Sequence, residues 1–135
     1  MTASAVLDTH ILVWWRSDPG RLTATQRDLL DRIEESGEPF RVSAITIWEL
    51  GKLVERGHLA IQRPLDLWLG EIEQHPRLEV VPVTARIVAE SCLLQKDGFH
   101  KDPADQLIAA TARCLGLPLV TLDERIRAWG KVRVV

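Results

Sequence analysis

The stretch Ala5-Val6-Leu7-Asp8-Thr9-His10 begins with a short apolar run that ends at an acidic residue. A second stretch, Leu119-Val120-Thr121-Leu122-Asp123, repeats this arrangement near the other end of the chain. Short apolar runs of this kind are typical of buried strands in a parallel sheet. The carboxyl ends of parallel strands share one edge, and ligands bind in the crevice there. We therefore expect Asp8 and Asp123 to lie close together at that edge.

Between these two stretches, short β-rich runs alternate with longer helical patterns, and Pro- and Gly-containing turn signals separate them. Such alternation predicts an α/β fold, a three-layer sandwich with a central, mostly parallel five-stranded sheet flanked by helices. The expected strands cover residues 5–7, 41–43, 79–83, 119–122 and 132–135. The expected helices cover residues 10–16, 23–35, 44–56, 64–74, 85–95, 103–115 and 124–129.

The composition is that of an ordinary globular chain. With 135 residues, 46% of them apolar and 27% charged, we expect a single domain over residues 1–135. No apolar run approaches the roughly 20 residues that cross a bilayer. Residues 1–4 lack the basic start of a signal peptide, so a cytoplasmic protein is expected. Cys92 and Cys114 fall on apolar helix faces, which predicts buried thiols and no disulfide.

Two further acidic residues, Glu49 and Asp105, lie within predicted helices. Asp102 followed by Pro103 has the pattern of a helix start, with Asp as the N-cap and Pro at the first helical position. Asp105 then falls in the first turn, where the helix dipole favours a negative charge. The two strand-terminal acids can likewise be N-caps. Each of these aspartates, taken alone, therefore has a purely structural explanation.

Glu49 is harder to explain in this way. It lies far from any cap, on the same helical stripe as Ile45 and Leu53. A carboxylate that interrupts an apolar stripe is expected to be buried and paired or to face a cavity. The alternative is a helical ion pair with the basic residues that follow on the helix, Lys52 at three and Arg56 at seven residues further on. We favour the cavity.

Carboxylates gathered in one crevice repel one another unless a cation neutralises them or some remain protonated. Hard divalent cations take oxygen ligands, and Mg²⁺ is held by a few carboxylates together with waters and phosphates. The four acids therefore favour a site for Mg²⁺, with Mn²⁺ as a substitute. The four histidines are scattered and predict no site for a softer metal. The chain also lacks a Gly-rich phosphate loop and a Gly-x-Ser-x-Gly elbow.

These stretches resemble the PIN-domain family, and most of all the VapC-type toxins of bacterial toxin–antitoxin pairs. The resemblance covers essentially the full length and rests on residues 5–10, 43–50, 102–110 and 119–123. It implies an acidic quartet made of Asp8, Glu49, Asp105 and Asp123. It also implies an accompanying hydroxyl at Thr121 and, as in one branch of the family, an additional acid at Asp102. His10 stands where many relatives carry Ser or Asn.

The resemblance implies a metal-dependent endoribonuclease that is the toxin of such a pair, is inhibited by a cognate antitoxin and forms a homodimer. In this hypothesis Asp8 and Asp105 chiefly hold the metal, which activates a water, while Glu49 and Asp123 complete the site or accept a proton. The net charge of −2 provides no overall field that attracts RNA. Phosphate contacts would then come from basic residues near the site: Lys52, Arg56, His100, Lys101 and Arg125.

Two other functions with the same fold stay open, a PIN nuclease of RNA processing and a non-catalytic interaction module. A phosphohydrolase of the haloacid-dehalogenase type is disfavoured, because that chemistry needs a second Asp where this chain has His10. The tryptophans of the first half also have two interpretations. They either belong to the core or form the groove that binds the antitoxin, and they are Trp14, Trp15, Trp48 and Trp68.

Overall fold

The computed structural model describes residues 4–135. The expectation about a signal peptide concerns residues 1–4, most of which lie outside the described residues. The strands are β1 (Val6–Leu7), β2 (Phe40–Ser43), β3 (Leu78–Val81) and β4 (Leu119–Val120). The helices are α1 (Thr9–Ser17), α2 (Ala24–Ser36), α3 (Ala44–Glu55), α4 (Leu65–Glu73), α5 (Ala85–Lys96), α6 (Pro103–Leu115), α7 (Glu124–Trp129) and the short 3₁₀ helix η1 (Pro19–Arg21). All seven predicted α-helices are present, and their ends agree within one residue.

The sheet is parallel and has the strand order β3-β2-β1-β4. The chain first adds strands on one side of β1 and later returns to add β4 on the other side. This reversal is a topological switch point, where open α/β sheets bind their ligands. Leu7 pairs with Val120, so the residues that follow β1 and β4 leave the sheet at the same level.

The prediction of five strands is wrong within the described residues. Residues 132–135 meet the sheet at one parallel bridge, between Leu119 and Val134. Three backbone hydrogen bonds, from Leu119 and Thr121 to Arg133 and Val135 and back, accompany this bridge. The strand expected over residues 79–83 also ends early, at Val81, since Pro82 has no N–H to donate to a neighbouring strand.

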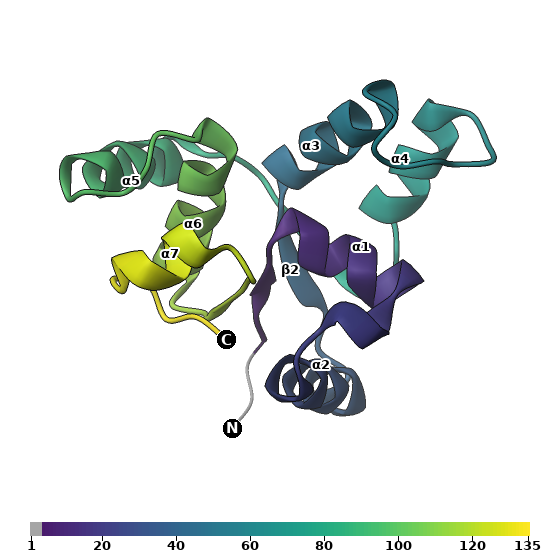
Figure 1. Ribbon diagram of the computed structural model, residues 1–135, viewed down its shortest axis with the longest axis horizontal. Helices are drawn as coiled ribbons and strands as arrows, with labels where there is room; N and C mark the ends of the chain where they lie inside the picture. The colour runs from purple at the N-terminus through teal and green to yellow at the C-terminus, as the bar shows by residue number, and fades with distance from the viewer. Residues whose placement is uncertain (1–3) are drawn as a thin grey trace.

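Helices cover both faces of the sheet, with α1, α2 and α4 on one side and α5, α6 and α7 on the other (Figure 1). Successive side chains of residues 5–7, in and just before β1, point to opposite faces of the sheet. Ala5 and Leu7 belong to the core under α1 and α2, while Val6 belongs to the core under α6. The helices α1, α3, α6 and α7 all begin at one edge of the sheet, and this places their first turns around a common space.

Within residues 4–135, every helix is too short or too polar to cross a bilayer.

Both cysteines are free. Cys114 is half-buried, but Cys92 is exposed, so the prediction of a buried thiol is wrong there. The reason is that α5 turns Ile87, Ser91 and Leu94 inward, which leaves Cys92 on the outer face of the helix.

Candidate active site

Asp8 lies directly after β1 and caps the N-terminus of α1. Its Oδ1 accepts a hydrogen bond from the backbone N–H of Thr9 at 2.8 Å, and its Oδ2 accepts one from the Thr121 hydroxyl at 2.7 Å. Thr121 follows β4, so this contact ties together the ends of two neighbouring strands. Asp8 is only 8% exposed, and burial raises its pKa in spite of both hydrogen bonds.

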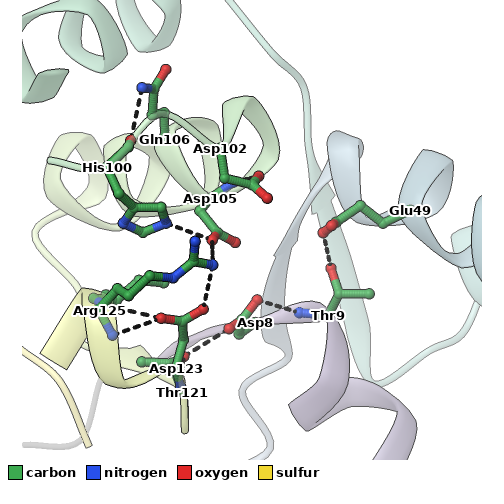
Figure 2. A network of polar contacts seen from close by, with 11 residues as sticks. Asp8, Thr9, Glu49, His100, Asp102, Asp105, Gln106, Thr121, Asp123 and Arg125 are labelled. Carbon is green, nitrogen blue, oxygen red and sulfur yellow. Dashed lines mark hydrogen bonds and ion pairs between the residues drawn. The ribbon is translucent and has the colours of Figure 1, made fainter.

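Asp123 follows β4 and caps α7. Its Oδ1 accepts hydrogen bonds from the backbone N–H groups of Arg125 at 2.8 Å and Ile126 at 3.2 Å. The guanidinium of Arg125 turns back over the site and lies 3.2 Å from Asp123 Oδ2 and 3.3 Å from Asp105 Oδ2 (Figure 2). Burial alone would raise the pKa of Asp123, but the hydrogen bonds from Arg125 and the two backbone N–H groups outweigh it and lower the pKa.

Asp105 lies in the first turn of α6 and is 8% exposed. Its Oδ2 lies 2.7 Å from Nε2 of His100, whose ring stacks on Phe99 with centroids 4.4 Å apart. Burial, followed by the charges of the neighbouring carboxylates, raises the pKa of Asp105 to about 6, although the hydrogen bond from His100 acts in the opposite direction.

The tautomer of His100 follows from its surroundings. Its Nδ1 is buried and has no hydrogen-bond partner in the part of the chain that the structure describes. A proton on Nδ1 would be a buried, unpaired donor, which is costly. We therefore assign a proton to Nε2, which donates it to Asp105.

Glu49 reaches the site from α3, on the side opposite Arg125 (Figure 2). Its Oε1 accepts a hydrogen bond of 2.5 Å from the Thr9 hydroxyl, which also lies 3.1 Å from the hydroxyl of Thr46. Lys52, the alternative partner, pairs with Glu55 at 3.2 Å and does not contact Glu49. The helical ion pair that the sequence offered for Glu49 is therefore wrong.

One cleft of about 770 Å³ contains all four predicted acids, together with Asp102. Burial raises the pKa of Glu49 to about 7, and the charges of Asp8 and Asp105 add to this effect. The acids are not equally close. Asp105 and Asp123 have carboxylate oxygens within 4.8 Å of each other and of a His100 nitrogen. Glu49 does not belong to this close group, and its carboxylate is hydrogen-bonded to the Thr9 hydroxyl.

The remaining predicted residues have separate places. Asp102 is exposed at the rim of the cleft and caps α6, accepting a hydrogen bond from the backbone N–H of Asp105 at 3.1 Å. Among the basic candidates, only Arg125 and His100 contact an acid of the cleft within residues 4–135. Arg56 and Lys101 are exposed, and the Lys52 ammonium lies 5.7 Å from the centroid of the Trp48 ring.

Sequence reasoning missed the polar residues that hold the acids in place. Thr9 and Thr46 meet between α1 and α3 and fix Glu49, and His100 fixes Asp105. Thr9 directly follows Asp8, but nothing in the sequence indicates that its hydroxyl turns toward α3. The spacing of five residues between His100 and Asp105 does not predict their contact either. His100 precedes the helix, and its ring folds back over the first turn.

Three of the four tryptophans, Trp14, Trp15 and Trp68, are half-buried against the core on the α1 side, as the core interpretation predicts. Trp48 differs, being 54% exposed. A second and more apolar groove, of about 320 Å³, lies between α1 and α4. Trp68 forms part of its wall together with Leu12 and Ile72.

The chain is similar to known proteins. Residues 5–132 match the family model of the PIN domain. Ribonuclease VapC22 of Mycobacterium tuberculosis (strain ATCC 25618 / H37Rv) is 34% identical over 125 residues, which are 93% of this chain and 91% of the relative.

Two solved structures of lower sequence identity share the fold. A toxin–antitoxin complex from Klebsiella pneumoniae matches with a TM-score of 0.66 and 21% identity, over 97% of this chain and 95% of that one. VapBC2 from Rickettsia felis, bound to a DNA fragment of its promoter, matches with a TM-score of 0.68 and 18% identity, over 98% and 97%. From the family model and the VapC22 relative together, the chain belongs to the PIN-domain family and, within it, to the VapC-type proteins.

Proposed function

We propose that this protein is the toxin of a toxin–antitoxin pair and that it hydrolyses RNA phosphodiester bonds at the acidic cleft with the help of Mg²⁺. The observation that carries the proposal is a set of carboxyl groups gathered in an open cleft, where burial raises the pKa of three of them. The pKa is about 7 for Glu49 and about 6 for Asp105, and that of Asp8 is raised as well. Strongly raised pKa values in a cleft are typical of functional sites.

The side chains fit a hard divalent cation. The donors are carboxylate oxygens, the ligands that Mg²⁺ and Mn²⁺ prefer. Asp8, Asp105 and Asp123 would hold the ion, with Glu49 completing the site directly or through water. His100 directs its Nε2 proton at Asp105, so its lone pair is not available on that side and a softer metal gains no nitrogen ligand. When bound, the ion would offset the phosphate charge and lower the pKa of a water.

The residues around the acids have separate tasks in this proposal. Thr121 and His100 orient the carboxylates of Asp8 and Asp105. Thr9 orients Glu49, whose pKa of about 7 suits a group that accepts a proton from the attacking water near neutral pH. Arg125, whose side chain is 60% exposed, is placed to contact a phosphate at the mouth of the cleft.

We infer a protein partner as well as an RNA substrate. The apolar groove beside α4, with Trp68 in its wall, suits the apolar face of an amphipathic helix from a cognate antitoxin. The complexes found among the structural relatives support this assignment. We further propose a homodimer that acts in the cytoplasm. A non-catalytic interaction module is the weaker alternative, because such a module gains nothing from several buried carboxylates that repel one another.

A substitution at Asp8 tests the proposal. Mg²⁺ or Mn²⁺ should raise the melting temperature of the wild-type protein, since a ligand that binds only the folded state stabilises it, by about 2.7 kcal/mol at 100 times Kd. Asp8→Asn should remove this shift and the cleavage of single-stranded RNA. Asp31→Asn, an exposed change on α2, is the matched control and should keep both. An Asp8→Asn protein with an unchanged response to metal would contradict the assignment.

A further inference from the structure

We propose that the cleft holds a second subsite beside the acids, in which an unpaired RNA base stacks on a ladder formed by His10, Trp14 and Arg21. This inference rests on the proposed function and names the part of the substrate that the cleft would bind next to the cleaved phosphate. The three residues are called the α1 ladder below.

The α1 ladder is a row of three neighbouring flat groups. His10 and Trp14 are one helical turn apart on α1, with ring centroids 5.7 Å apart and ring planes tilted by 46°. Arg21, in η1, places its guanidinium carbon 4.5 Å from the centroid of the Trp14 ring. His10 and Arg21 are exposed and Trp14 is half-buried. The ladder therefore offers accessible flat groups at both of its ends.

The α1 ladder and the acids share one cavity. All three ladder residues line the cleft of about 770 Å³ that also contains Asp8, Glu49 and the other acids. A helix rises about 1.5 Å per residue, so Trp14 lies about 9 Å along α1 from Asp8. Stacked nucleotides are about 3.4 Å apart along one strand, so this distance is only a few nucleotides. A strand whose phosphate lies at the acids can thus reach the ladder.

The chemistry of the α1 ladder suits single-stranded RNA. Unpaired bases stack on aromatic rings and on the planes of Arg side chains, and this contact tolerates any base because every base has a π face. The acids repel phosphates, and Arg21, which also lines the cleft, supplies positive charge. The ladder would therefore hold a strand that the acidic end alone does not attract.

A second Arg–Trp pair on the same helix lies outside the acidic cleft. Arg16 lies over Trp15, 5.6 Å from its centroid. Trp15 packs edge-on against Phe40 at 5.0 Å and donates a hydrogen bond to Glu34 at 3.0 Å. Neither Arg16 nor Trp15 lines the acidic cleft. Arg16 is therefore a matched control for Arg21.

The test compares two RNA probes. A fluorescein-labelled single-stranded octamer of mixed sequence and an abasic octamer of the same length are bound by the full chain in EDTA and followed by fluorescence anisotropy. The KM and kcat for their cleavage are then measured in Mg²⁺. The wild-type protein should bind the octamer with bases about tenfold more tightly than the abasic one. His10→Ala and Arg21→Ala should lose most of this preference and raise KM more than they lower kcat, whereas Arg16→Ala should keep it. Melting temperatures establish that these exposed changes leave the protein folded.

Three results would contradict the proposed subsite, and they have different consequences for the proposed function. If His10→Ala and Arg21→Ala behave like Arg16→Ala, the ladder does not bind RNA, while cleavage that depends on Mg²⁺ and Asp8 still supports the proposed function. If the two variants lose affinity for an antitoxin peptide but not for RNA, the ladder belongs to the protein interface. If the wild-type protein neither binds nor cleaves RNA, both proposals fail.

Discussion

Replacing Glu49 by Gln should make the metal-free protein more stable at pH 8. The change removes a negative charge but keeps the shape of the side chain and an oxygen that accepts the hydrogen bond from Thr9. The pKa of Glu49 is raised from 4.5 to about 7 in the folded protein. The folded state therefore holds this proton more tightly than the unfolded state does. The stability that this provides is complete below about pH 4.5 and is lost as the pH rises through about 7.

The size of the effect follows from that shift. The difference between about 7 and 4.5 is about 2.5 pKa units, and each unit corresponds to 1.36 kcal/mol, which gives an upper limit of about 3 kcal/mol. Glu49 is partly exposed, so solvent and small movements of the acids reduce this value. We expect a gain of about 1 to 3 kcal/mol at pH 8, and almost none at pH 4.

Urea unfolding in EDTA at the two pH values measures this difference directly. Glu55→Gln is the control, because Glu55 lies on the same helix, is exposed and pairs with Lys52 outside the cleft. Added Mg²⁺ should make the wild-type protein the more stable of the two at pH 8, because the ion stabilises it more than it stabilises the Glu49→Gln variant. The variant should also lose most of its ribonuclease activity. A Glu49→Gln protein no more stable than wild type at pH 8 in EDTA would refute the view that repulsion and burial strain the ionised carboxylate.

Substitutions at two other residues of the cleft, Arg125 and Asp123, test the metal site. Arg125→Ala should cost little stability, since the side chain is 60% exposed, but it should tighten Mg²⁺ binding in calorimetric titrations because the guanidinium no longer bridges Asp105 and Asp123. Equal metal affinity in variant and wild type would show that the guanidinium does not compete with the ion. Asp123→Asn should keep the cap of α7, whereas Asp123→Ala should lose about 1 kcal/mol in denaturant unfolding. Both changes at Asp123 should weaken the response to Mg²⁺, and a normal response in either would remove Asp123 from the metal site.

The helices could be predicted closely because their ends are determined by local chemistry. In α6, Asp102 and Pro103 start the helix and Gly116 ends it with a φ of 66°, a backbone conformation that Gly adopts without strain. The meeting of Asp8 with Thr121 also follows from the sequence once the strands are parallel. Both residues leave neighbouring strands at the same level.

Features that depend on contacts between distant elements could not be predicted. The last expected strand is reduced to one bridge beside β4, and no local pattern in the sequence indicates this. The hydroxyl of Thr9 turns to Glu49 only because α1 and α3 approach each other at their N-terminal turns. Trp48 is apolar and lies on a helix, yet it is exposed, since α3 turns its other face to the core.

The structural and the functional explanations of the acids are compatible. A parallel strand leads into the next helix at its carboxyl end, so the residue that caps that helix lies at the edge where ligands bind. Asp123 shows the consequence, because the N–H groups that it caps and the guanidinium of Arg125 lower its pKa and keep it charged. Asp105 and Glu49 cap no helix, and their pKa values rise to about 6 and about 7. Asp123 is therefore suited to hold a cation at any physiological pH, while Glu49 is suited to take up and release a proton. Asp8 also caps a helix, but its burial raises its pKa.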